Sequence, residues 1–499
     1  MPQVAIPAMT STGQPVLILK EGSNETKGRE ALRNNIEVAK IIAELVRTSL
    51  GPRGMDKMLV DSLGDVTITN DGATILKELD VQHPTAKLLV EIAKATDAEV
   101  GDGTTTSVVL AGELISHAED LIEKGVHPTV VVDGYRKASK KAVEVLSGLA
   151  IKVNPTDREW LRKIALTAMA SKVVSSISPR LADIAIDAVL QVAEKRDGGY
   201  KVDIDSVKVE KKPGGAMTDT MFVKGIVIDK EVVHGGMPKK VEKAKIALIN
   251  APLEIEKPEF DTKINVTDPS QMKAFLDEEA RILREMVQKV KAAGANVVFC
   301  QKGIDDLAQH YLAKEGILAV RRVKMSDMEK LAKATGGRVV TTLDDLTPND
   351  LGYAELVEER KIEEDKWVFV EGCKDPKAVT ILVRGGSQRI VDEAERSIHD
   401  ALMVVKDVVE NPAVVGGGGA PEAETAYQLR NWAQTLSGRE QLAVQAFADA
   451  IERIPLTLAE NAGMNPLDAK TELSKAHGEG RKWAGVDPFE SKVVDMDAK

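Results

Sequence analysis

Aromatic residues are scarce in this sequence and make up 3% of its 499 residues. Any hydrophobic core must therefore rest on Val, Ile, Leu, Ala and Met side chains. The only two cysteines, Cys300 and Cys373, are too few and too far apart for a disulfide framework or a thiolate metal site. No run approaches the roughly 18 apolar residues of a membrane-spanning helix, and the N-terminus lacks the basic region and apolar core of a signal peptide. These absences predict a cytoplasmic protein without a membrane partner.

Positive charge is also in short supply, because 67 Lys and Arg stand against 78 Asp and Glu, for a formal net charge of −11. No basic stripe is available to neutralise phosphates, which argues against a nucleic-acid partner. The chain contains no GxxxxGK[ST] P-loop, no HExxH and no CxxC, and its seven histidines show no metal-ligand spacing. The composition, 43% hydrophobic and 29% charged residues, is typical of a soluble globular protein. The chain is long enough for about three domains.

Hydrophobic periodicity divides the chain into helical ends and a mixed middle. The predicted elements, in chain order, are a helix over 25–50, a strand hairpin at 57–61 and 65–69, a helix from about 73, helical segments over 85–149, alternating strands and helices over 245–342, a strand in "AVTILVRGG", and helices over 393–409 and 421–476. Alternation of strands and helices is typical of an α/β domain with helices packed on a sheet. The expected fold class is therefore mixed α and β.

A charged, proline-containing extended stretch inside the mixed region leads into an amphipathic helix near 269–292. The apolar stripe of this helix comprises Met272, Phe275, Leu276, Leu283, Met286 and Val287. Such a stripe is usually part of a core. The alternative is an exposed arm that touches a partner, which the long charged approach suggests.

The stretch "GDGTTTS", residues 101–107, combines small residues with hydroxyls before a helical segment. Glycines let backbone N–H groups approach phosphate oxygens, and the N-terminus of a helix adds partial positive charge. Asp102 would repel phosphate unless a hard cation lies between them, which suggests Mg²⁺ bridging the carboxylate to a nucleotide. The alternative is an ordinary capped helix start, which the motif alone favours. "NDG" (70–72) and "GGGG" (416–419) are weaker signals, typical of a turn and of a flexible joint.

The sequence resembles the subunits of group II chaperonins, the family that includes the archaeal thermosome and is related to the eukaryotic cytosolic chaperonin. The resemblance rests on motifs in the family's order and spacing over nearly the whole chain: "RNNIEVAKIIAELVRTSLGP", "NDGATILKE", "GDGTTTSVVLAGEL", "GVHPT", "LTPNDLGYAELVEERK", "VTILVRGG", "DEAERSIHDAL" and "LAENAGMNPLD". It implies an equatorial ATP-binding domain from 1–149 and 405–499, an intermediate hinge domain from 150–217 and 370–404, and an apical substrate-binding domain over 218–369. A helical protrusion near 252–287 would form a built-in lid. It also implies a further strand and helix after "VVDM", whereas this chain ends at Lys499.

The resemblance further implies an ATP site assembled from distant segments. Asp102 would hold Mg²⁺, Asp71 and Asp400 would position and activate the attacking water, and a K⁺ ion would lie near the phosphates. The residues implied to bind nucleotide are Leu50, Gly51, Pro52, Gly103, Thr104, Thr105, Thr106, Ser171, Lys172, Gly417 and Gly418.

The function expected from the resemblance is that of an ATP-dependent molecular chaperone. Like or paralogous subunits would form a double ring that encloses unfolded protein and closes its lid on ATP hydrolysis. Two other readings are an unrelated soluble Mg-ATPase or kinase, and a structural ring subunit that binds no nucleotide. The first predicts a monomer or dimer that transfers phosphate to a defined acceptor, and the second predicts that loss of Asp400 has no effect.

Overall fold

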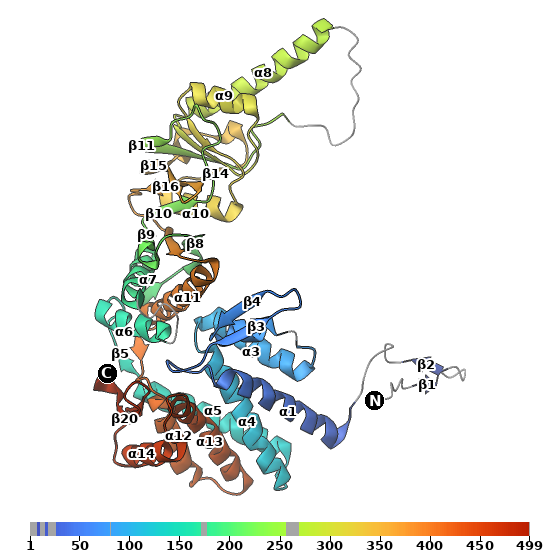
Figure 1. Cartoon of the computed structure of the whole chain (residues 1–499), viewed down its shortest axis with the longest axis vertical. Coiled ribbons are helices and arrows are strands. Elements are labelled where there is room, and N and C mark those ends of the chain that lie inside the picture. The colour runs from blue at the N-terminus through green and yellow to red at the C-terminus, as the bar shows by residue number, and fades with distance from the viewer. Residues whose placement is uncertain are drawn as a thin grey trace. The chain divides into compact units, whose positions relative to one another are not determined.

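The computed structural model describes residues 7–9, 15–17, 26–79, 81–170, 177–255 and 269–498. The chain divides into two compact units (Figure 1): the first comprises Met1–Ile151 and Val414–Lys499, and the second comprises Lys152–Ala413. The first unit is therefore built from both ends of the chain. The finer division into equatorial, intermediate and apical domains stays a prediction.

The first unit is mainly helical. Its helices are α1 (Gly28–Arg47), α2 (Gly72–Glu78), α3 (Pro84–Val100), α4 (Thr104–Glu123), α5 (Pro128–Leu149), α12 (Ala420–Ala433), α13 (Arg439–Asn461) and α14 (Pro466–Gly478). Among its described residues, strands pair as hairpins: β1 (Pro7–Met9) with β2 (Pro15–Leu17), β3 (Lys57–Val60) with β4 (Val66–Thr69), and β19 (Ala484–Asp487) with β20 (Lys492–Asp495). The predicted helices and the β3–β4 hairpin are confirmed.

Helices from the two ends of the chain pack directly on one another in this unit, as the blue, teal and red ribbons of Figure 1 show. α4 contacts both α1 and α13. The approach of α4 to α1 is close: a Cβ on Gly112 would lie 2.1 Å from the Cβ of Ala43. Ile36, Ala39 and Val46 are buried on the inner face of α1, as its periodicity predicts, and Val46 is completely inaccessible to solvent.

The described part of the second unit contains a large sheet, a three-stranded sheet and a small hairpin. A seven-stranded sheet has the order β10 (Gly225–Ile228), β16 (Asp365–Glu371), β15 (Gly352–Ile362), β11 (Lys240–Ile249), β12 (Val297–Cys300) and β13 (Leu318–Val320), with β14 (Val339–Val340) also paired to β11. A three-stranded sheet has the order β8 (Val207–Pro213), β17 (Val379–Gly385) and β9 (Met221–Val223). A small hairpin joins β6 (Glu194–Arg196) to β7 (Gly199–Lys201), and β5 (Ile151–Lys152) and β18 (Ala413–Val414) lie at the boundary of the unit.

The helices of this unit are α6 (Arg158–Met169), α7 (Ser178–Val192), α8 (Pro269–Ala292), α9 (Asp306–Lys314), α10 (Met325–Thr335) and α11 (Gln388–Glu410). The apolar runs of β11 and β12 are buried on both faces, so Leu248 and Phe299 are completely inaccessible to solvent. α11 begins earlier than its apolar period suggests, because the Ser387 hydroxyl accepts the Ile390 N–H and starts the helix at Gln388.

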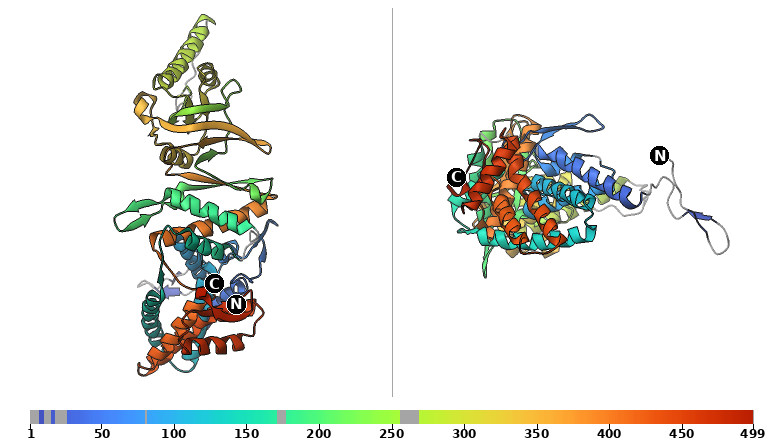
Figure 2. Two further views of the ribbon diagram at one scale, coloured as in Figure 1. Left: turned by 90° about the vertical axis from the view of Figure 1, so that its left-hand side faces the viewer. Right: turned by 90° about the horizontal axis from the view of Figure 1, so that it is seen from below.

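The apolar stripe of α8 consists of a buried half and an exposed half, which fits both interpretations of the sequence. Leu283 and Val287, in its second half, are buried against the large sheet. Met272, Phe275 and Leu276, in its first half, are 51%, 48% and 58% exposed, and this half projects beyond the sheet (Figure 2). One helix therefore supplies core at one end and an exposed apolar surface at the other. The approach to it, 256–268, lies outside the described residues.

Candidate functional site

The loop between α3 and α4 is shaped by two left-handed glycines. Gly101 ends α3 with a φ of +70°, and Gly103 precedes α4 with a φ of +78°. Gly103 is the N-cap residue of α4 and, because it has no side chain, it offers no cap hydrogen bond to the first N–H groups of the helix. Amides at a helix start and the helix dipole attract anions, so Thr104–Thr106 is the candidate anion position. This geometry favours the phosphate cradle over a helix start closed by its own cap.

Asp102 lies between the two glycines and is exposed. Its Oδ1 accepts the Gly103 N–H at 2.6 Å, which fixes the carboxylate beside the start of α4. A carboxylate next to an anion position is the donor set that suits Mg²⁺ bound together with phosphate. The residues present therefore fit a magnesium–nucleotide group.

"NDG" lies directly against this loop. Asp71 caps α2 and accepts the Thr104 hydroxyl at 3.3 Å. The next residue, Gly72, touches the backbone of α4, because a Cβ placed there would lie 2.8 Å from the Thr105 nitrogen. The structure thus joins two of the predicted motifs, Asp71 and the threonine run.

The turn "LGP" and the glycine run both lie against one face of α13. A Cβ on Gly51, which has a φ of +82°, would lie 2.3 Å from Leu458, and one on Gly419 would lie 2.6 Å from Pro455. Asn461, three residues beyond Leu458, donates hydrogen bonds to the Leu50 carbonyl at 2.8 Å and the Arg47 carbonyl at 3.1 Å. The two motifs, more than 360 residues apart in sequence, are therefore held on neighbouring turns of the same helix.

Sequence reasoning missed the strand that adjoins the predicted nucleotide residues Gly417 and Gly418. The Val486 N–H of β19 donates to the Gly418 carbonyl at 2.8 Å. Met496, after β20, lies 3.6 Å from the position of a Gly417 Cβ and 2.7 Å from that of a Gly485 Cβ. In the sequence, the hairpin could have been recognised only from the two short apolar stretches that flank the turn residues in "WAGVDPFESKVVDM". These stretches are too short to distinguish a hairpin from a loop.

Asp400 belongs to the second unit. It lies on α11 and is 8% exposed, and the His399 Nδ1 is 3.9 Å from its Oδ1. Its predicted part in water activation stays a prediction. The predicted nucleotide-sensing residues Ser171 and Lys172 lie outside the described residues.

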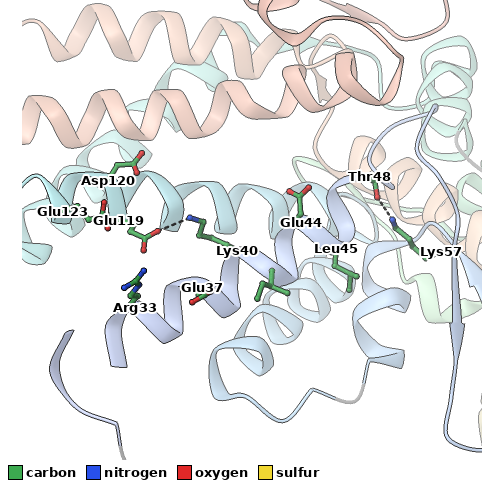
Figure 3. Close-up of a pocket in the computed structure, with 11 residues that line it drawn as sticks. Arg33, Glu37, Lys40, Glu44, Leu45, Thr48, Lys57, Glu119, Asp120 and Glu123 are labelled. Atoms are coloured by element: carbon green, nitrogen blue, oxygen red, sulfur yellow. Dashed lines mark hydrogen bonds and ion pairs between the residues drawn. The ribbon is translucent and has the colours of Figure 1, made fainter. Parts of the chain in front are cut away.

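An open groove of about 1020 Å³ runs along α1 and α4, and none of the residues that line it belongs to the predicted site (Figure 3). Its lining carries five carboxylates, Glu37, Glu44, Glu119, Asp120 and Glu123, against three cationic side chains. Lys40 is already paired with Glu119 at 3.0 Å. An excess of carboxylates with no helix N-terminus would repel phosphate, so the groove does not compete with the α4 loop as a nucleotide site.

The two compact units and the mixed sheet with its projecting helix agree with the architecture expected of a chaperonin subunit. The chain matches the model of the TCP-1/cpn60 chaperonin family over residues 42–499 and belongs to that family. It is 58% identical over 488 residues to a thermosome subunit of Methanopyrus kandleri, covering 98% of this chain and 90% of that protein. It is equally 58% identical over 487 residues to the thermosome subunit alpha of Archaeoglobus fulgidus, covering 98% and 89%.

A solved structure shows the same architecture. It is the open-state monomer of a group II chaperonin from Methanococcoides burtonii, with 45% identity and a TM-score of 0.59, covering 80% of this chain and 93% of that one. The resemblance to group II chaperonins and the mixed α and β fold class are therefore confirmed, and chaperonin function follows from the family. Within the described residues, no helix combines the length and the apolar character needed to cross a bilayer.

Proposed function

We propose that this chain binds and hydrolyses ATP at the N-terminus of α4 and uses that reaction to drive a chaperonin cycle. The observation that carries the proposal is the start of α4, where the N-cap residue is a glycine, Asp102 lies beside it, and Asp71 is bonded to Thr104. These groups supply an anion position, a cation ligand and a further carboxylate within one small region. The nucleotide contacts proposed here are Leu50, Gly51, Pro52, Gly103, Thr104, Thr105, Thr106, Gly417 and Gly418, with Ser171 and Lys172 proposed from the family resemblance alone.

The proposed chemistry is attack of a water molecule on the terminal phosphate. Mg²⁺ held by Asp102 would neutralise charge on the phosphates, and the family resemblance adds K⁺, for which no ligand is assigned. The Thr104–Thr106 amides and hydroxyls would bind and orient the phosphate oxygens. Asp400 is proposed as the base that takes the proton of the attacking water, and Asp71 as the carboxylate that holds this water.

The proposed assembly is a double ring of like or paralogous subunits in the cytoplasm, with no nucleic-acid or membrane partner. Its client would be non-native protein with exposed apolar surface, and lid closure would follow ATP hydrolysis. The exposed apolar end of α8, formed by Met272, Phe275 and Leu276, supports the lid proposal, because a surface of this kind is stabilised by contact with another surface.

The proposal is tested by native mass measurement with and without Mg·ATP, combined with refolding of a denatured test protein. We expect a multi-subunit ring and ATP-dependent recovery of the test protein. Monomers or dimers that phosphorylate a small acceptor would instead support the kinase reading. A ring whose refolding activity is unaffected by Asp400→Ala would support a purely structural subunit.

A further inference from the structure

The Asp71 carboxylate is held by more contacts than a helix cap needs. Its Oδ2 accepts both the Thr74 N–H at 2.8 Å and the Thr74 hydroxyl at 2.7 Å. Its Oδ1 accepts the Thr104 hydroxyl at 3.3 Å. Its own N–H donates to the Thr69 hydroxyl at 3.1 Å. Both carboxylate oxygens and the backbone of Asp71 are therefore fixed by threonines.

Other aspartates at helix starts show that a hydroxyl contact is not required for a cap. The Ser206 hydroxyl does donate to Asp203, the residue that precedes the short 3-10 helix Ile204–Ser206, at 2.9 Å, but two aspartates that cap α-helices lack such a contact. Asp157 at α6 and Asp305 at α9 each accept a backbone N–H at the helix start, at 3.0 and 2.8 Å. Over the described part of the chain, neither of them receives a side-chain hydroxyl from its own helix. One hydrogen bond from a backbone N–H is therefore enough to cap a helix. We infer that the additional bond from the Thr74 hydroxyl restricts the Asp71 carboxylate rather than stabilising the helix start.

Thr74 is itself held firmly. It lies in the first turn of α2, a helix of seven residues, and its neighbours Ile75 and Leu76 are completely inaccessible to solvent. A β-branched side chain in a helix has few χ1 rotamers, so the hydroxyl stays close to the cap position. A donor fixed in this way restricts the torsion angle of the carboxylate that it contacts.

We propose that Thr74 is a positioning residue for Asp71, and this inference rests on the proposed ATPase function. The Thr74 hydroxyl occupies Oδ2 and so turns Oδ1 towards Thr104 and the start of α4. Without that hydroxyl, the amide bond alone would hold Oδ2, and the carboxylate could rotate away from the phosphate position. Catalysis tolerates such misplacement poorly, because the attacking water must be held in line.

The direct test compares Thr74→Val, which keeps the shape but removes the hydroxyl, with Thr74→Ser, which restores it. We expect kcat for ATP hydrolysis to fall roughly 10- to 100-fold in Thr74→Val, as for loss of a hydrogen bond to a charged group, and to recover in Thr74→Ser. KM for ATP should stay within about twofold, because Asp71 holds water rather than nucleotide. Thr129→Val is the matched control, since the Thr129 hydroxyl contacts the cap residue His127 of α5 at 2.7 Å in the same way, and it should leave kcat unchanged.

A double-mutant cycle separates positioning from general damage to the fold. In an Asp71→Asn background, Thr74→Val should lower kcat by less than about twofold, because the residue acts through a carboxylate that is no longer there. An equal loss in both backgrounds would overturn the inference. So would a Thr74→Val protein with parental kcat.

A structural measurement keeps this inference separate from the ATPase proposal. Crystal structures of the parental and Thr74→Val proteins should show one Asp71 conformer in the first and a rotated or divided carboxylate in the second. A single unchanged conformer in Thr74→Val would overturn the inference even if the protein hydrolyses ATP. Absence of hydrolysis in the parental protein would overturn the proposed ATPase function, while the conformer comparison would still decide the role of Thr74.

Discussion

The Thr104 hydroxyl donates to the Asp71 carboxylate at 3.3 Å and so connects two helix starts that are 33 residues apart in sequence. α2 is capped by the Asp71 carboxylate, whereas the N-cap residue of α4, Gly103, makes no side-chain cap bond. A negative group is therefore placed at the edge of a position that attracts anions. This pairing suits a reaction in which a water molecule must be held next to a bound phosphate.

Replacement of Asp400 by alanine should lower kcat for ATP hydrolysis by about 10²–10⁴-fold, the usual contribution of a general base, while ATP still binds. Equilibrium binding of labelled ATP and steady-state hydrolysis measure the two effects separately. Asp407→Ala, seven residues along the same helix, is the matched control and should hydrolyse at the parental rate. Equal rates in Asp400→Ala and the parental protein would contradict the assignment.

Gly72→Ala should abolish tight ATP binding, because the added Cβ would lie 2.8 Å from the Thr105 nitrogen and 2.9 Å from its Cα. One of the two helix starts must then move, and the amides of α4 move with it. Isothermal titration with Mg·ATP measures the loss. Gly148→Ala is the control: it lies within α5, the new Cβ meets nothing within 4 Å apart from its own stretch of helix, and the change should be neutral or stabilise by about 0.5–1 kcal/mol.

Lys208→Met should destabilise the second unit by about 3–5 kcal/mol. The Lys208 side chain is 8% exposed, and its ammonium lies 2.8 Å from Glu210 and 2.9 Å from Asp327 and donates to the Val227 carbonyl. Without it, the buried Asp327 carboxylate would lose its cation. Differential scanning calorimetry should show a lower melting temperature, and Lys208→Met combined with Asp327→Leu should recover part of the loss. A variant that melts at the parental temperature would contradict this reading.

Asp350 should make the protein sensitive to acid. Hydrogen bonds from Arg338 at 2.6 Å and from the hydroxyl and N–H of Thr347 lower the pKa of this carboxyl to about 2. In the unfolded chain the pKa of an aspartate is about 3.9. Above that pH the charged Asp350 carboxylate stabilises the folded state, because its hydrogen bonds exist only there. This contribution to the free energy of unfolding is lost as the pH falls from about 3.9 through about 2.

The measurement for Asp350 is the melting temperature of the parental protein and of Asp350→Asn between pH 7 and pH 3. The variant should melt lower at pH 7 by a margin that is constant down to about pH 5 and narrows below pH 4. Arg338 remains charged over this range and cannot produce the change itself. A margin independent of pH would contradict the assignment.

The sequence was sufficient for the parts of the fold that depend on local periodicity. The inner face of α1 and the apolar runs of β11 and β12 follow directly from the spacing and length of their apolar residues. The β19–β20 hairpin was not predicted, because four-residue strands joined by a turn carry too little periodicity. The stripe of α8 was predicted as one feature, yet only its second half meets a sheet to pack on.

The site was predictable as a set of motifs but not as a geometry. "GDGTTTS" alone favoured a capped helix, whereas in the structure its last glycine, the N-cap residue of α4, supplies no side-chain cap, which supports the proposed phosphate position. The roles of Asn461 and Val486 depend on α13 and β19 meeting turns from distant parts of the chain. Such contacts come from tertiary packing, which no local pattern in the sequence encodes. The Thr74 hydroxyl bond was also out of reach, since the threonine three residues after an aspartate reads equally well as an ordinary helix residue.

The central claim, that ATP is hydrolysed with a cation held by Asp102 at the start of α4, is tested most directly by Mg²⁺-dependent hydrolysis in the parental protein and Asp102→Ala. We expect the parental protein to hydrolyse ATP with saturable dependence on Mg²⁺. Asp102→Ala should lose most of its kcat and require far more Mg²⁺ for what remains. Hydrolysis by Asp102→Ala at the parental rate and with the parental Mg²⁺ dependence would contradict the account.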